Sequence, residues 1–175
     1  MVGHNPKIEL MHSMNSALNR SSMAPLVLRV VLGGLFIWHG VDKFDAGLEM
    51  VEEGFRMWGV PAPALAAPVV AVTEIVAGTA LVLGLLTRLA AIALAVILIG
   101  ALIWAKDILT DNGTGFISAR PDPGYELDLA YLAGLVALVF VGPGRWSVDA
   151  GLGIEPTSDR VRDPDLDNRL VAERR

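Results

Sequence analysis

Long apolar stretches separated by short polar connections dominate the chain after residue 24. A helix needs roughly 20 residues to cross about 30 Å of hydrocarbon, and it satisfies its own backbone hydrogen bonds there. The stretches therefore predict four membrane-spanning helices, over about residues 25–44, 65–86, 89–105 and 125–141. The last two are near the short end of this length, so flanking anchors or local bilayer thinning are expected.

A second pattern fills the connection between the first two predicted spans. Apolar residues recur there at helical spacing: Leu48, Val51, Phe55 and Trp58. Charged residues occupy the opposite side, so we predict a short amphipathic helix on the outer membrane face. The predicted fold class is thus an all-α membrane protein, a four-transmembrane-helix bundle with a short amphipathic helix in the first outer loop.

Basic residues flank the predicted spans unequally. Arg29, Arg88 and Arg145 lie at the ends that face one side of the membrane, where they are interpreted as topology anchors. Because an excess of basic residues marks the cytoplasmic side, both termini are predicted to be cytoplasmic. Only Thr87-Arg88 separates the second and third spans, which predicts a tight antiparallel hairpin. The predicted domains are a polar cytoplasmic segment, a membrane domain and a flexible cytoplasmic tail, over residues 1–24, 25–150 and 151–175.

Composition supports a membrane location and excludes some functions. The 175 residues are 53% hydrophobic and 19% charged, against about 25% charged residues in soluble domains. A net charge of −5 gives no basic field for nucleic acid, so no nucleic-acid partner is expected. The chain has no cysteine, which excludes disulfides, a thiolate nucleophile and cysteine-ligated metal or iron–sulfur sites. The histidines are too few and too scattered for a credible metal site, so none is predicted.

Glu74 lies within the otherwise apolar second span. An ionisable group in hydrocarbon is costly and typically marks a pathway, a proton step or a paired partner. Gly78 shares its face, and on the first span Gly40 and Lys43 share a stripe with His39 at its edge. Small residues beside ionisable ones predict close-packed faces turned toward the centre of the bundle.

The depth of these residues along their spans predicts that the polar faces meet. His39 and Lys43 are near the outer end of the first span, and Glu74 is in the outer half of the second. We therefore predict an outward-opening polar pocket with Glu74 and His39 as candidate catalytic, proton-moving groups. The predicted lining of the pocket is Lys43, Asp128, Tyr131, Gly40 and Gly78.

A structural role is the alternative for each of these polar residues. For Glu74, the alternative is that its pairing with a neighbouring helix serves only to fix the packing of the helices. The functional and the structural interpretation of this residue have about equal weight. His39 and Lys43 are close enough to the interface to extend toward the headgroups. Asp128 opens the last span, where a carboxylate favours the helix N-terminus in any case.

Several motifs follow one another in a fixed order. They are Arg29-x3-Gly33-x2-Phe36-x2-His39-Gly40-x2-Lys43, Gly59-x-Pro61, Glu74-x3-Gly78-x5-Gly84-x2-Thr87-Arg88, Glu126-x4-Tyr131 and Gly142-Pro143-Gly144-x2-Ser147-x-Asp149. In this order the chain resembles the DoxX family of small four-span bacterial membrane proteins, over about residues 25–150. The resemblance implies a compact four-helix bundle in the bacterial cytoplasmic (inner) membrane. It also implies a redox association, since some relatives are membrane subunits of thiosulfate–quinone oxidoreduction.

The leading hypothesis is a membrane subunit associated with a quinone-linked redox complex. A quinone is its candidate ligand, and no covalently bound cofactor is expected. Whether the chain is itself an enzyme stays open, since a shared fold does not transfer an activity. The expected partners are the lipid bilayer and either a partner protein or a second copy of the chain.

Two other functions remain as alternatives. The first is a non-catalytic scaffold or accessory subunit that docks a partner through the outer amphipathic helix and the charged tail. The second is a small-solute transporter, which four spans and the lack of an inverted repeat disfavour.

Overall fold

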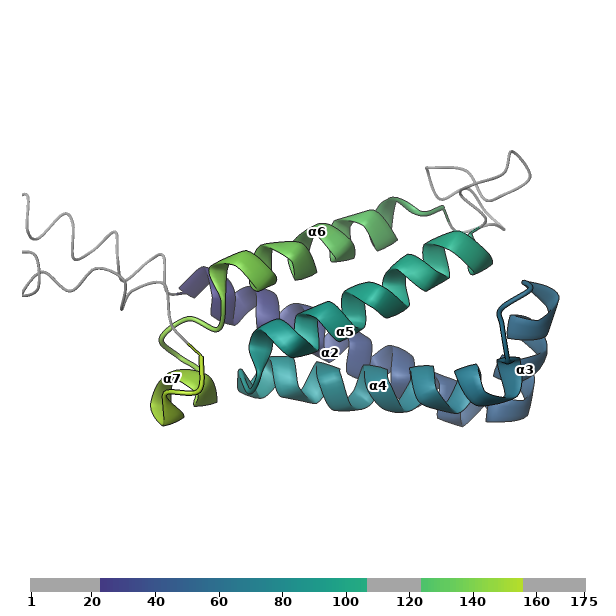
Figure 1. Cartoon of the computed structure of the whole chain (residues 1–175), viewed down its shortest axis with the longest axis horizontal. Helices are drawn as coiled ribbons and strands as arrows, with labels where there is room; N and C mark the ends of the chain where they lie inside the picture. Colours follow the sequence, from purple (N-terminus) through teal and green to yellow (C-terminus); the bar gives the residue numbers. More distant parts are fainter. Residues whose placement is uncertain (1–22, 107–123, 156–175) are drawn as a thin grey trace, which may run out of the picture.

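The structure is a computed structural model that describes residues 23–106 and 124–155. All the regular structure in this part of the chain is helical, and its elements are α2 (Met23–Ala46), α3 (Leu48–Met57), α4 (Pro63–Leu83), α5 (Thr87–Gly100), the π-helix η1 (Ala101–Ala105), α6 (Glu126–Val141) and α7 (Val148–Leu152). Long helices run alongside one another, with α3 at one end of the bundle and α7 at the other (Figure 1). We refer to these as the α3 end and the α7 end.

Three of the described helices are long and apolar enough to cross a membrane: Met23–Ala46, Pro63–Leu83 and Thr87–Ala105. They coincide with the first three predicted spans, so the all-helical class and these apolar helices are confirmed. The fourth apolar stretch also forms a helix, α6, which has 16 residues and is shorter than the other three. Its crossing of the membrane stays a prediction.

The helices α2 and α4 pack most closely, along a seam of glycines. A Cβ atom at Gly33 would lie 2.6 Å from the carbonyl oxygen of Gly78. A Cβ atom at Gly78 would lie 2.8 Å from the carbonyl oxygen of Gly33. Because the two backbones touch here, only residues without a side chain fit, as in close-packed membrane helices.

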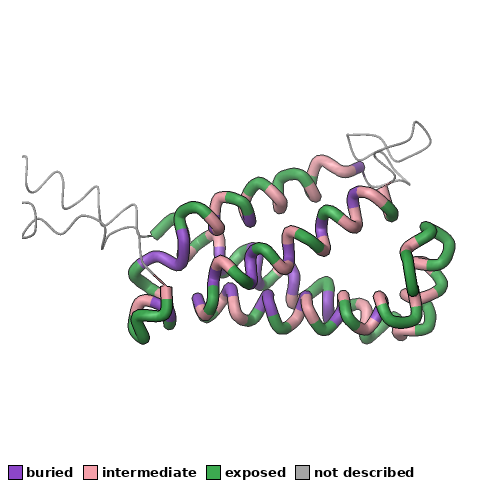
Figure 2. The backbone as a smooth tube through the Cα atoms, in the orientation of Figure 1, coloured by how far each residue is buried: buried purple, intermediate pink, exposed green. Residues whose placement is uncertain are grey.

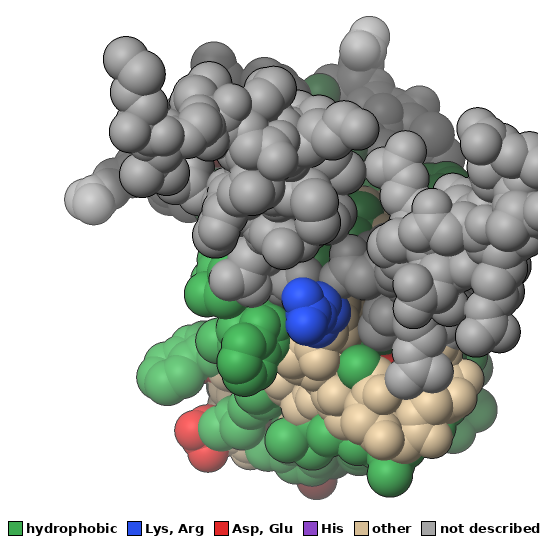
Figure 3. Space-filling model, turned by 90° about the vertical axis from the view of Figure 1, so that its left-hand side faces the viewer, with side chains coloured by type: hydrophobic (Ala, Val, Ile, Leu, Met, Phe, Trp, Pro, Cys, Tyr) green, Lys and Arg blue, Asp and Glu red, His purple; other side chains and the backbone are tan. Residues whose placement is uncertain are grey.

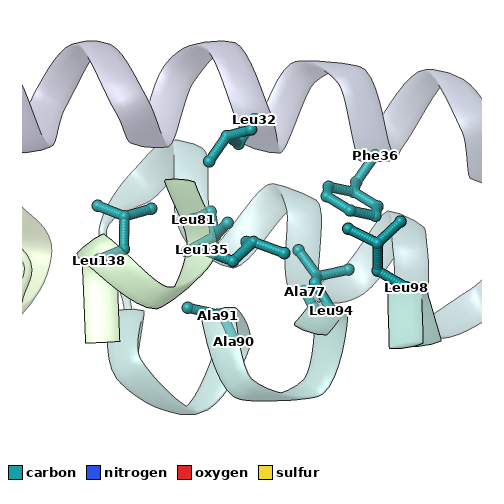
Figure 4. Close-up of a cluster of buried hydrophobic side chains, with 10 residues drawn as sticks. All are labelled: Leu32, Phe36, Ala77, Leu81, Ala90, Ala91, Leu94, Leu98, Leu135 and Leu138. Atoms are coloured by element: carbon teal, nitrogen blue, oxygen red, sulfur yellow. The ribbon is translucent and has the colours of Figure 1, made fainter. Parts of the chain in front are cut away.

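The interior of the bundle is a small cluster of leucine and alanine side chains with one phenylalanine. Leu81, Leu94, Leu135 and Leu138 are fully buried in it, and Phe36 is nearly so (Figure 4). The outward faces carry exposed aliphatic side chains instead, among them Val31, Val72, Val76, Ile92 and Val96. Buried residues therefore follow the facing sides of the helices while exposed ones follow the outside (Figure 2). An apolar exterior over a small apolar interior is what contact with lipid requires.

The hairpin between α4 and α5 differs from its predicted position. The structure ends α4 at Leu83 and begins α5 at Thr87, so Thr87 and Arg88 belong to the first turn of α5. Gly84 ends α4 in the left-handed conformation (φ 70°), which glycine adopts without steric cost. The prediction of a two-residue connection was wrong because it followed hydropathy alone, and the leucines after Gly84 are apolar without being helical.

Parts of the predicted domain organisation lie outside the described residues. These are nearly all of the polar segment 1–24 and most of the tail 151–175. Both assignments stay predictions.

Candidate functional site

An ion pair joins α2 to α4 inside the bundle. The ammonium nitrogen of Lys43 lies 2.7 Å from Oε2 of Glu74 and donates a hydrogen bond to it. Glu74 is near the middle of α4 with only 6% of its side chain exposed, whereas 21% of the Lys43 side chain is exposed. Lys43 thus reaches inward from the last turn of α2, and a buried carboxylate has a side-chain partner from another helix.

His39 lies one turn before Lys43 on α2 and is exposed. The backbone carbonyl of His39 accepts a 3.3 Å hydrogen bond from the Lys43 ammonium. Its imidazole interacts electrostatically with Glu74 on α4 and also with Asp128 on α6. His39 is therefore close enough to α4 and α6 for its charge to be felt by a carboxyl group on each helix.

The first turns of α6 bring two more predicted residues to this region. Asp128 is in the first turn of the helix, together with Glu126. Tyr131 follows one turn later and packs edge-on against Phe36 of α2, with 6.5 Å between ring centroids. The structure therefore brings Lys43 to Glu74 and packs Tyr131 against α2, while the joint pocket of the whole predicted set stays a prediction.

Lys106 is a member of this group that sequence reasoning missed. Lys106 follows the third predicted span, and its charge acts on Asp128. The π-helix η1 immediately precedes it, and such turns often occur at functional sites. The depth of Lys106 in the membrane was the sequence feature that could have revealed this proximity. The third predicted span ends on the same side of the membrane on which the fourth begins.

Gly40 and Gly78 occupy the seam between α2 and α4. A Cβ atom at Gly40 would lie 2.6 Å from the Ile75 side chain and 2.8 Å from the carbonyl oxygen of Ala71. Close helix packing therefore explains why neither position carries a side chain. Their predicted role in lining a pocket stays a prediction.

The predicted topology anchors have unequal surroundings at the α7 end. Arg29 is fully buried, and its Nη2 donates to the backbone carbonyl of Trp146. Arg88 donates from Nε to the carbonyl of Val139 at 3.0 Å and is partly exposed. Arg145 is exposed. Only the last two therefore have the exposure expected of a charge at a membrane boundary.

A buried carboxylate that sequence reasoning overlooked organises this end. Asp149 is fully buried and accepts hydrogen bonds from the backbone N–H of Leu86 (2.8 Å), the backbone N–H of Thr87 (3.0 Å) and the Thr87 hydroxyl (2.9 Å). Its own N–H donates to the carbonyl of Gly84 at 2.9 Å. Asp149 thus caps the start of α5, where a negative charge is favourable, and its charge acts on the buried Arg29. No short-range sequence signal joins residues 62 positions apart.

The two ends therefore offer different chemistry. Toward the α3 end, carboxylate, ammonium, imidazole and phenol groups come from several helices, a set that can hold protons and donate hydrogen bonds. Within the two described stretches, no three histidine or acidic side chains are grouped as metal ligands. At the α7 end, main-chain N–H groups and one hydroxyl satisfy Asp149, whereas Arg29 donates to a main-chain carbonyl from Nη2 alone and keeps Nε and Nη1 without a hydrogen bond among the described residues.

Comparison with known proteins gives the same family as the motifs. The DoxX family profile matches residues 24–107. The chain is 35% identical to "Uncharacterized membrane protein Rv3486" of Mycobacterium tuberculosis, over 78% of this chain and 86% of that protein. It is 37% identical to "Putative oxidoreductase CatD" of Bacillus subtilis, over 51% of this chain and 65% of that protein. No solved structure matches. The chain belongs to the DoxX family.

Proposed function

We propose that this protein is a membrane subunit associated with a quinone-linked redox complex and that its site is centred on Glu74. The observation that carries the proposal is the 2.7 Å contact between Lys43 and Glu74 inside an apolar helical bundle. A buried charge pair is weak evidence for stability, because removing both charges from water is costly. Ionisable groups within membrane helices more often serve a ligand or proton pathway. The printed name of the Bacillus subtilis relative is consistent with redox chemistry.

The proposed architecture completes the membrane domain. In it α6 crosses the bilayer as a fourth span, and α3 lies in the outer interface. Both termini are on the cytoplasmic side of the bacterial inner membrane. The packing of α6 against α5 and α2 supports this arrangement, as do the exposed apolar residues of α3 and of its C-terminal flank, Met50, Met57 and Trp58.

The residues of the site suit a quinone headgroup. Its two carbonyl oxygens need hydrogen-bond donors, which Lys43, His39 and Tyr131 can provide. When bound, a quinone would accept or release electrons together with protons. Glu74 and His39 would hold those protons, because carboxyl and imidazole groups are the usual proton carriers in such sites. His39 lies toward the predicted outer end of α2, from which a proton would pass to the water outside the membrane.

Titration of the purified chain with a ubiquinone or menaquinone analogue tests this function. We expect saturable binding that Glu74→Gln weakens by roughly tenfold, which corresponds to about 1.4 kcal/mol. The matched control is Glu53→Gln, which makes the same chemical change at an exposed carboxylate on α3. Absence of saturable binding, or equal binding by wild type and Glu74→Gln, would count against the proposal.

A scaffold function is the second candidate, and the surface of α3 favours it. The stripe Leu48, Val51 and Phe55 is half-buried, while Met50 and Met57 on a neighbouring side are 69% and 74% exposed. Methionine-rich surfaces adapt to protein partners. A partner that co-purifies with Glu74→Gln but is lost from a Met50→Glu/Met57→Glu variant would favour this function over the first.

A further inference from the structure

The α7 end carries a segment, residues 145–154, that buries the carboxylate of Asp149 and exposes several large apolar side chains. Asp149 fixes the segment to the α4–α5 hairpin and is fully buried. The exposed side chains are large and apolar: Trp146, Val148, Leu152 and Ile154. Trp146 is 64% exposed and Leu152 is 68% exposed. Water favours the opposite arrangement, because the hydrophobic effect drives apolar side chains inward. Such a surface suits contact with lipid or protein better than contact with bulk water.

The apolar surface continues onto the neighbouring helices. On the α4–α5 hairpin to which the segment is bonded, Leu83, Leu86 and Leu89 are exposed. At the end of α6, Phe140 and Val141 are exposed as well. Viewed from this end, hydrophobic side chains cover much of the described surface, and basic side-chain atoms lie among them (Figure 3). The segment thus continues the exposed apolar exterior of the helices at the α7 end.

The charge at this segment fits the headgroup layer of anionic lipid. Arg145 is exposed and precedes Trp146, and tryptophan is the residue most typical of the membrane–water interface. The two carboxylates of this part of the chain that the structure describes, Asp149 and Glu155, are engaged within the protein. Asp149 caps α5, and Glu155 lies 3.6 Å from the guanidinium of Arg88. A basic group beside an exposed apolar surface is attracted to anionic phospholipid.

We propose that residues 145–154 form a lipid-interface anchor that seats the α7 end of the bundle in an anionic headgroup layer. Trp146, Val148, Leu152 and Ile154 enter the boundary between headgroups and acyl chains. Arg145 contacts lipid phosphate. The rigid connection to α5 through Asp149 holds the apolar side outward, so the anchor positions the whole bundle and not merely the segment. This inference depends neither on the quinone-linked function nor on which leaflet the α7 end faces.

Depth-dependent fluorescence quenching of Trp146 tests the lipid contact. The full chain with Trp38, Trp58 and Trp104 changed to phenylalanine is reconstituted into vesicles of phosphatidylcholine and phosphatidylglycerol. We expect blue-shifted emission that lipid brominated near the headgroup quenches more than lipid brominated near the chain end. If the triple variant does not fold, the difference between wild type and Trp146→Phe gives the same signal.

Two results would overturn the lipid contact. Red-shifted emission quenched by acrylamide from the water phase would show that the segment is in water. Blue-shifted emission that neither brominated lipid nor acrylamide quenches would show that protein covers Trp146, either a partner or a second copy of the chain.

The same signal tests the role of Arg145. Quenching by the shallow bromolipid is expected to be stronger in vesicles with phosphatidylglycerol than in phosphatidylcholine alone. Arg145→Gln is expected to abolish that difference, whereas the control Arg56→Gln, at the other end of the bundle, leaves it intact. Equal quenching in both lipids would overturn the assignment of Arg145 to an anionic headgroup.

Discussion

The two ends of the bundle hold buried charge in different ways. At the α7 end, Asp149 accepts two backbone N–H groups and a hydroxyl, and Arg29 donates to a backbone carbonyl. Toward the α3 end, Glu74 is bound by the side chain of Lys43 from another helix, and Lys43 is partly exposed. One arrangement is built into the main chain, whereas the other depends on side chains.

This difference separates a structural role from a chemical one. A main-chain partner moves only when the backbone moves, so the Asp149 network favours a single arrangement of α5 and the segment after α6. A side-chain partner can leave by changing rotamer, and a lysine stem can carry its charge toward the interface. The proposed function requires the Lys43–Glu74 pair to open for a proton or a ligand, and a side-chain partner is compatible with that requirement. A buried charge in a membrane bundle is thus informative about function only when its hydrogen-bond partner is also known, and in particular whether that partner is a main-chain group or a side chain.

Of the substitutions considered, Asp149→Ala should cause the largest loss of unfolding free energy, and the effects at the two ends of the bundle are compared with it. The variant removes the cap of α5, the acceptor of three hydrogen bonds and a negative charge that acts on the buried Arg29. We expect a loss of about 3–5 kcal/mol in unfolding free energy, because buried donors are left without an acceptor and a buried positive charge loses a nearby negative one. Denaturant unfolding in detergent measures it, with Asp42→Ala, an exposed carboxylate on α2, as the control. A loss no larger than that of the control would contradict a structural role for the Asp149 network.

Gly84→Ala should rank second and tests the close approach at the same end. A Cβ atom there would lie 1.9 Å from Nη1 of Arg29, and the backbone is left-handed. Overpacking and left-handed strain together predict a loss of roughly 2–4 kcal/mol. Gly34→Ala is the matched control, since nothing lies within 4 Å of its added atom. Similar unfolding midpoints for the two variants would rule out the tight contact.

Glu74→Gln should lower the unfolding free energy less than either substitution at the α7 end. Lys43 is partly exposed and can move its charge toward water, so a loss of about 1–2 kcal/mol is expected, between the values for exposed and buried pairs. A double-mutant cycle with Lys43→Met isolates the coupling between the two side chains, expected at about 1 kcal/mol. A loss as large as that of Asp149→Ala would break the comparison, because the pair would then be a main support of the fold.

Arg56→Ala should have the smallest effect. Arg56 pairs with Glu52 and Glu53 on the surface of α3, where more than half of its side chain is exposed. Such pairs contribute about 0.3–0.5 kcal/mol each and weaken with salt. Unfolding at low and high ionic strength measures the contribution. A salt-independent loss above about 1 kcal/mol would assign α3 a packing role that its exposed charges do not indicate.

The helices were predictable because their signals are local. Length and hydropathy predicted α2, α4 and α5, and glycine spacing predicted the close-packed faces of the first two. The depth of Lys43 and Glu74 along their spans also predicted that they would face one another, and the structure brings them to 2.7 Å. Their use as a functional site stays a prediction.

The errors and omissions concern contacts between distant residues. Thr87 was assigned to a connection because its neighbours are apolar, although Asp149 caps it within α5. The role of Arg29 as a topology anchor stays a prediction, but its hydrogen bond from Nη2 to the main-chain carbonyl of residue 146 was not foreseen. Hydropathy and helical period contain no information about such partners, since the partner is set by how the helices pack.

By itself, the sequence determined that this chain forms apolar membrane helices with a costly carboxylate among them, because burial in hydrocarbon depends on the composition of each stretch. Only the tertiary structure decided how each charge is satisfied. The partner of Glu74 is the side chain of Lys43, which can move away by changing rotamer. The partners of Asp149 include main-chain N–H groups, which cannot move away without unfolding the start of α5. The reason is geometric: a hydrogen-bond partner is defined by distance in space, and in this bundle the decisive partners are 31 and 62 positions apart in the chain.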